Sequence, residues 1–172
     1  MSCELRTTFF NDKKIEVVST PNLVDLVWGA ERPLRPQNPV FHLETKYTGE
    51  ESISKYERVA ANLGDADFLL VSALDDIAWL LNLRGCDIEY NPVFFSYLLF
   101  SPKTKSVKLY IDDVKVEAVL DYLTKINVTI APYHQINEDL TAHAAQGVKI
   151  ALDKNAVNAD LYKLVAKQSV NI

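Results

Sequence analysis

The sequence has few of the residues from which reactive sites are commonly built. Its 172 residues include two cysteines, five glycines and three histidines. Cys3 and Cys86 fit neither a metal-ligand spacing nor a framework of several disulfides, and they indicate a reducing compartment. The glycines do not cluster into a phosphate-binding loop, and no Gly-x-Ser-x-Gly segment occurs. The signatures of nucleotide-binding loops and of serine hydrolases are therefore absent.

Long apolar runs and an excess of positive charge are also missing. No run of 18 apolar residues predicts a membrane span, and the first six residues lack the apolar core of a signal peptide. A formal net charge of −5 argues against nucleic acid and anionic membrane as partners. Hydrophobic residues make up 48% of the chain and charged residues 24%, which is typical of a globular protein. We expect one ordinary domain and a cytoplasmic location.

A proline-rich stretch divides the chain into unequal parts. Pro33, Pro36 and Pro39 remove backbone donors and disfavour helix in the residues before them. Such a stretch is expected to run extended over a surface, as an inter-domain linker does. We expect residues 1–39 to be the end of a preceding domain and a linker, and residues 40–172 to form the domain. On this interpretation the apolar run Ile15–Val18 and the pair Phe9 and Phe10 belong partly to the preceding domain.

Beyond the linker the sequence predicts alternating helices and strands. Thr48–Glu51 and Ser72–Asp75 resemble capping boxes that open two helices, and Asp112–Asp113 is expected to cap a third. Two further helices are expected around 136–144 and 161–165. Short apolar runs predict strands at 67–72, 94–100, 107–111, 127–131 and 148–152. The second and third strands form a hairpin in which Lys108 and Tyr110 face outward. The fold class is α/β, a mixed β-sheet flanked by helices.

The histidines and paired carboxylates are weak candidates for catalysis. His42, His134 and His143 do not occur in the spacing of a metalloprotease helix. Asp75–Asp76 and Asp112–Asp113 lie where a strand leads into a helix, and there aspartate serves as a cap and meets the helix dipole. Cys86 has no evident base nearby. We therefore predict no catalytic residue and no metal ligand in this chain.

One segment, Asn82–Tyr97, combines aromatic, amide and charged side chains in an irregular connection. Such a loop suits the wall of a cleft that holds a peptide. Alternatively, the aromatic residues pack in the core and Arg84 pairs locally with Asp87. Both interpretations remain open on the residues alone. The candidates for a substrate cleft are Arg84, Asp87, Tyr90, Asn91, Phe94, Phe95 and Tyr97.

The same segment carries a resemblance to a known family. Leu74–Gly85, Asp87 and Tyr90–Tyr97 resemble the second domain of the three-domain cytosolic aminopeptidases P. Asn22–Trp28 with Arg32-Pro33 is similar to that family's junction between its first two domains, and Tyr47–Gly49 to the start of a helix. The resemblance extends from about residue 15 onward. Cys86 replaces an expected serine, and Glu89 stands where proline is frequent.

The resemblance implies a creatinase/prolidase N-terminal fold with a ribonuclease-H-like motif. It implies that the whole protein is a homodimeric metallopeptidase that removes an N-terminal residue preceding proline. Two divalent metal ions, usually manganese, would then be held by a catalytic domain that is not part of this chain. In this domain, Tyr90, Phe94, Phe95 and Tyr97 would form an apolar cleft wall, with Arg84 and Asn91 as polar anchors.

Two other interpretations are consistent with the sequence. The chain could be part of a homologue that has lost its metal ligands and acts as a regulatory or scaffold protein. It could also be an independent binding or nuclease-like domain that shares only the ribonuclease-H-like topology. That last interpretation requires an acidic cluster converging on a metal, which the pattern of aspartates does not predict.

Overall fold

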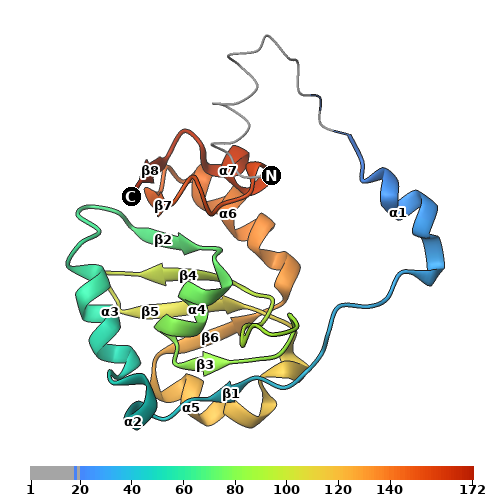
Figure 1. Ribbon diagram of the computed structural model, residues 1–172. Coiled ribbons are helices and arrows are strands. Elements are labelled where there is room, and N and C mark those ends of the chain that lie inside the picture. The colour runs from blue at the N-terminus through green and yellow to red at the C-terminus, as the bar shows by residue number, and fades with distance from the viewer. Residues whose placement is uncertain (1–17, 19) are drawn as a thin grey trace.

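The computed structural model describes residue 18 and residues 20–172, and its centre is a six-stranded sheet. The strand order is β6-β5-β4-β2-β7-β8 (Figure 1). β4 pairs antiparallel with both β2 and β5, whereas the pairs β5–β6, β2–β7 and β7–β8 are parallel. The predicted mixed sheet is confirmed. The strands are β2 (Phe68–Val71), β4 (Tyr97–Ser101), β5 (Ser106–Tyr110), β6 (Val128–Ala131), β7 (Ile150–Leu152) and β8 (Ser169–Asn171).

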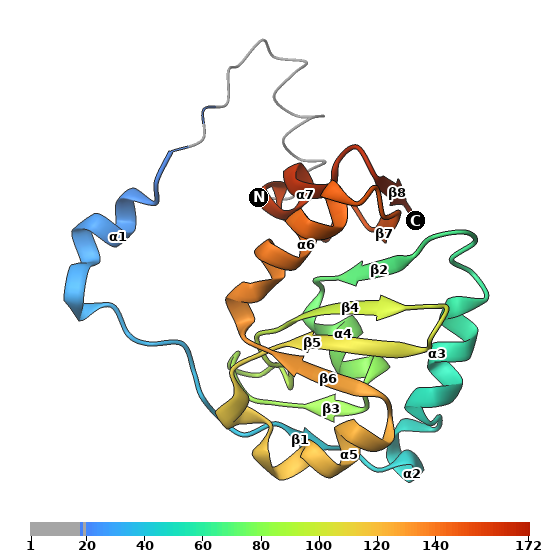
Figure 2. The same cartoon turned by 180° about the vertical axis from the view of Figure 1, so that it is seen from behind.

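Helices cover both faces of the sheet (Figures 1 and 2). α3 (Ser52–Ala60), α4 (Leu74–Leu80) and α5 (Leu120–Lys125) bury Tyr56, Ile77 and Leu123 in one apolar cluster. α6 (Ile136–Ala145) and α7 (Ala159–Val165) bury Leu140 and Leu161 in a second cluster on the opposite face. The sheet is therefore the middle of three layers.

A small strand pair extends the first cluster. β1 (Phe41–His42) pairs antiparallel with β3 (Leu83–Arg84), and α2 (Thr45–Thr48) follows β1. Val40 and Leu83 are buried among the side chains of α3 and α4. The sequence did not predict β1, β3 or β8, because strands of two or three residues are too short to show an apolar period.

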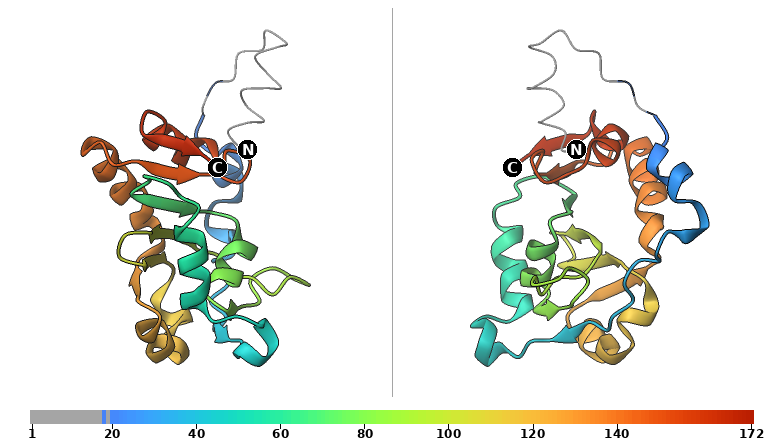
Figure 3. Two further views of the ribbon diagram at one scale, coloured as in Figure 1. Left: turned by 90° about the vertical axis from the view of Figure 1, so that its left-hand side faces the viewer. Right: turned by 45° about the vertical axis from the view of Figure 1, so that its right-hand side comes forward.

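The segment before β1 contributes little to either cluster. α1 (Leu23–Trp28) and the 3-10 turn η2 (Gly29–Glu31) have no buried residue, and residues 32–39 run extended, as Figure 3 shows. Val40, 1% exposed, is the first fully buried residue in the described part of the chain. Phe9, Phe10 and Ile15–Val17 lie outside the described residues. No helix in the described part of the chain is long and apolar enough to cross a membrane.

The predicted helix caps are wrong, although the helices are present. α3 begins after Glu51 and α4 after Ala73, and neither preceding residue accepts a side-chain cap bond. Thr48 instead ends α2, and its hydroxyl donates to the carbonyl of Glu50. After Asp112 the chain first forms two 3-10 turns, η3 (Asp113–Lys115) and η4 (Glu117–Val119), before α5. Asp75 and Asp76 lie in the first turn of α4 without capping it.

The outward orientation predicted for Tyr110 is also wrong. Tyr110 is fully buried beside α6, and its hydroxyl donates to the Asp139 carboxylate at 2.5 Å. Burial, and then the carboxylate, raise the pKa of Tyr110. Because helices cover both faces of the sheet, a side chain of β5 can be buried on either face, and Tyr110 is buried on the face opposite Leu109. Each of the five predicted strands is present, but β4 begins at Tyr97 instead of Phe94.

Candidate functional site

The candidate segment forms a folded-back loop between β3 and β4, which we call the 85–96 loop. The backbone N–H of Gly85 donates to the carbonyl of Pro92, and that of Asp87 to the carbonyl of Val93. Ile88 and Asn91 face each other in an isolated antiparallel bridge. The two arms of the loop are therefore joined by backbone hydrogen bonds, and its tip is the turn from Ile88 to Asn91.

Asp87 anchors this loop to the rest of the domain through a buried ion pair. Its side chain and that of Lys115 are 0% and 2% exposed, and they form a salt bridge. The same carboxylate oxygen of Asp87 accepts the backbone N–H of Phe95 at 2.7 Å. Lys115 also donates to the carbonyl of Pro36 at 3.5 Å, and its own carbonyl accepts the N–H of Val40. One lysine thus joins the proline-rich stretch, η3 and the loop.

Gly85 fixes the base of the loop by close contact. A Cβ at this position would lie 2.8 Å from Cβ of Phe94 and 3.1 Å from the carbonyl oxygen of Val93. Phe94 is fully buried in the first apolar cluster. Any larger residue at position 85 would therefore push the loop away from the core.

The tip of the loop carries an exposed aromatic side chain on a strained backbone. Tyr90 is 98% exposed and has a φ of 62°, a region that a tyrosine adopts only at a cost. Asn91 beside it is also exposed. Of the seven candidate residues, these two are the ones fully available to a binding partner.

The other candidates lie deeper and point in different directions. Arg84 donates to the carbonyls of Ala78 and Leu83, both at 2.8 Å. The alternative prediction, that Arg84 pairs with Asp87, is wrong because Asp87 pairs with Lys115. Tyr97 packs against Tyr133 on the α6–α7 face, with ring centroids 5.1 Å apart. Phe95 is half-buried. The structure does not gather the seven side chains on one surface.

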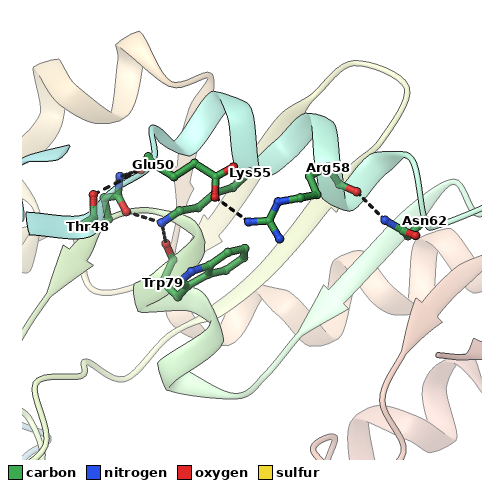
Figure 4. A network of polar contacts seen from close by, with 7 residues as sticks. Thr48, Glu50, Lys55, Arg58, Asn62 and Trp79 are labelled. Carbon is green, nitrogen blue, oxygen red and sulfur yellow. Dashed lines mark hydrogen bonds and ion pairs between the residues drawn. The ribbon is translucent and has the colours of Figure 1, made fainter. Parts of the chain in front are cut away.

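A second buried lysine, Lys55, which the sequence did not predict, stabilises the turn before β3, the strand that leads into the loop. Lys55 of α3 donates to the carbonyl of Trp79 at 2.7 Å and to the side-chain oxygen of Asn82 at 2.5 Å (Figure 4). The Asn82 amide in turn donates to the carbonyl of Glu50. Burial lowers the pKa of Lys55, and the nearby Glu50 carboxylate opposes that shift. The network ties α3 to the turn between α4 and β3, where Asn82 has a φ of 51°.

No metal centre is assembled in the part of the chain that the structure describes. No group of three or more His, Cys, Asp and Glu side chains is placed there to hold an ion. His42 stacks on Tyr122 with ring centroids 3.7 Å apart, and His143 packs against Phe68. The residues that the structure describes therefore do not fit a two-metal site.

Residues 31–172 match the family described as the creatinase/prolidase N-terminal domain. The match covers most of the chain, and the six-stranded mixed sheet agrees with it. The chain belongs to this family of domains.

Curated relatives carry the name of a particular peptidase. The chain is 48% identical over 134 residues to a protein of Coprinopsis cinerea named "Probable Xaa-Pro aminopeptidase P", and 49% identical over 132 residues to one of the same name from Tuber melanosporum. These matches cover 74% and 75% of this chain but 21% of each relative. The chain therefore spans about a fifth of the length of these relatives.

One solved structure is similar over almost the whole chain. It is an X-prolyl aminopeptidase from Caenorhabditis elegans, described as a cytosolic enzyme with a di-nuclear active site. The TM-score is 0.86 at 29% sequence identity, over 99% of this chain and 29% of that one. The resemblance noted on Leu74–Tyr97 is thus confirmed at the level of the family and of its named relatives.

Proposed function

We propose that this chain is a non-catalytic domain of a proline-specific metallo-aminopeptidase, which removes an N-terminal residue preceding proline. The names of the relatives and their identities near one half support this proposal. The two metal ions, which we propose to be manganese, would be held outside this chain. The di-nuclear site described for the C. elegans relative is consistent with that assignment.

The proposal includes the surroundings of the domain. Residues 1–39 would be the end of a preceding domain and a linker, and residues 40–172 the domain itself. The whole protein would act in the cytoplasm as a homodimer on peptides with proline in the second position. The domain would contact both the preceding and the catalytic domains.

The observation that carries the proposed role of the loop is the exposure of Tyr90 at its tip. A buried ion pair, a tightly packed glycine and backbone hydrogen bonds hold the loop, yet its tip exposes an aromatic ring on unfavourable backbone. Strain of this kind persists only where the surrounding structure enforces it, and it gathers at binding sites. The tip of the loop would therefore reach the active-site cleft of its own or a neighbouring subunit, limiting access to short peptide N-termini and excluding water.

The function of the whole protein is tested by peptide hydrolysis. The full-length protein, supplied with manganese, is expected to release the first residue of an Xaa-Pro peptide, and the 172-residue chain alone is expected to release none. Absence of turnover from the full-length protein would overturn the proposal and favour a regulatory or scaffold role. Turnover by the 172-residue chain alone would contradict the assignment of this domain as non-catalytic.

The role of the loop is tested by Tyr90→Gly in the full-length protein. Glycine removes the ring and adopts the positive φ readily, so the variant isolates the side chain. Loss of one anchoring aromatic contact is expected to lower kcat/KM for Xaa-Pro peptides about tenfold. Tyr47→Ala, which removes another exposed tyrosine from α2, is the matched control and is expected to change nothing. Equal kinetics for both variants would exclude the loop from the cleft.

A further inference from the structure

A pocket of about 350 Å³ lies beside β2, between the end of α3, α4 and the residues that follow β7 and β8. It is lined by β2 and the residues that follow it, by α4, by the end of α3, by the loop after β7 and by Ile172 after β8. The three strands are parallel, so their carboxyl ends lie at the same edge. This position places the pocket between secondary-structure elements that are far apart in the sequence.

The topology of the sheet explains why the pocket exists. After β2 the chain enters α4, which packs on one face of the sheet, whereas after β7 it leads to α7 on the opposite face. Two neighbouring parallel strands whose connections leave to opposite faces open a crevice beyond their carboxyl ends. In open α/β sheets, ligands bind in such crevices.

The walls of the pocket are largely apolar. Leu63, Val71, Leu80 and the ring of Trp79 contribute to its lining. Its volume lies within the range of pockets that hold small molecules. These walls suit an aromatic or aliphatic body of a few carbon atoms.

The uncompensated charges at the pocket are negative. Arg58 also lines it, but its guanidinium is paired with Glu50 at 2.6 Å. Asp76 and Asp153 both line the pocket, and neither forms a salt bridge within the described residues. Burial raises the pKa of Asp76, and the charges of Asp75 and Asp153 add to the shift. Both carboxylates line the same pocket, so a cation bound there would offset two negative charges.

We propose that this pocket binds a small organic cation, a primary ammonium group carried on an apolar body. The ammonium group pairs with the carboxylates of Asp76 and Asp153, and the body packs on Trp79 and Leu80. This site is separate from the 85–96 loop, and its existence does not depend on the peptidase assignment.

The test is a calorimetric titration of the 172-residue chain with three probes that share a phenyl ring on a two-carbon chain and differ in the charge of the terminal group. Phenethylamine is expected to bind saturably, 2-phenylethanol weakly and 3-phenylpropionate not at all. Asp76→Asn and Asp153→Asn are each expected to weaken phenethylamine about fivefold, as loss of one partly exposed ion pair does. Asp121→Asn, at an exposed position on α5, is the matched control and is expected to bind like the parent.

A variant that fills the pocket gives a second, independent result. Ala156 lines the pocket from an exposed loop, so Ala156→Trp can occlude it without disturbing the core. This variant is expected to keep the parent's thermal transition and to lose phenethylamine binding. Equal affinity for phenethylamine and 2-phenylethanol, unchanged binding by both aspartate variants, or no saturable binding at all would each overturn the proposal.

Discussion

The pair Lys115–Asp87 shows how much of this domain depends on single buried charges. Removing one partner of a buried ion pair leaves the other charge without compensation, which typically costs about 3–5 kcal/mol. Lys115→Met is expected to lower the free energy of unfolding by that amount, because Asp87 would remain buried. The double variant Lys115→Met, Asp87→Leu is expected to lose less than the sum of the two single variants. Urea unfolding of the four proteins measures this, and a loss below about 0.5 kcal/mol for Lys115→Met would contradict it.

Asp76 is expected to reduce stability at neutral pH. Its place in the first turn of α4 favours the carboxylate, but partial burial and the charges of Asp75 and Asp153 raise its pKa above 3.8. The folded protein therefore binds this proton more tightly than the unfolded chain, and the carboxylate form lowers stability above the folded-state pKa. Asp76→Asn should raise the free energy of unfolding at pH 7, by less than about 1 kcal/mol because the side chain is largely exposed.

The advantage of Asp76→Asn should shrink as the pH falls through the folded-state pKa and disappear below 3.8, where Asp76 is protonated in both states. Urea unfolding at pH 7, 5 and 4 follows this trend, with Asp121→Asn as the control. A variant less stable than the parent at pH 7 would show that Asp76 makes a stabilising contact in the folded protein.

The sequence does not reveal these buried lysines, and the reason is physical. Lysine is rarely fully buried, so Lys55 and Lys115 are expected at the surface. Their partners are Asn82 and Asp87, each at least 27 residues away along the chain. No local pattern can indicate a contact that exists only after the layers have packed.

At the scale of the element, both interpretations of the 85–96 loop, core packing and a binding surface, are consistent with the structure, each for different residues. Phe94 packs in the core, as the structural alternative expected, while Tyr90 and Asn91 are exposed, as a binding loop requires. In an irregular segment the sequence has no helical or strand period, so it does not show which aromatic residues are buried and which are exposed. The five predicted strands could be recognised because each lies in an apolar run of about five residues. β1, β3 and β8 have only two or three residues and form because they pair with neighbouring strands.

Tyr90→Gly is expected to stabilise the isolated chain although it impairs binding. The left-handed backbone conformation costs a tyrosine about 1 kcal/mol relative to glycine, and the fully exposed ring has no contacts to lose. The greater freedom of glycine in the unfolded chain offsets part of this gain. We expect the free energy of unfolding to rise by up to about 1 kcal/mol in thermal or urea unfolding. A clear loss of stability would mean that the ring packs against the domain.

At the scale of the whole molecule, the 85–96 loop and the pocket are connected to neighbouring strands, β4 and β2. Val71 at the end of β2 pairs with Leu98 near the start of β4, so the residues that leave β2 and those that enter β4 are neighbours. The residues that leave β2 line the pocket, and the residues that enter β4 come from the 85–96 loop. The two sites are therefore joined through neighbouring strand ends of one sheet.

The exposed apolar helix α1 gives the last prediction. Leu26 and Val27 are 77% and 90% exposed and contact neither apolar cluster of the domain. The double variant Leu26→Gln, Val27→Gln is expected to leave the free energy of unfolding of the 172-residue chain within about 0.5 kcal/mol. In the full-length protein the same variant should lower the thermal midpoint if α1 belongs to the end of the preceding domain, which is part of the proposal for residues 1–39. An unchanged midpoint there would place α1 in a solvent-exposed linker instead.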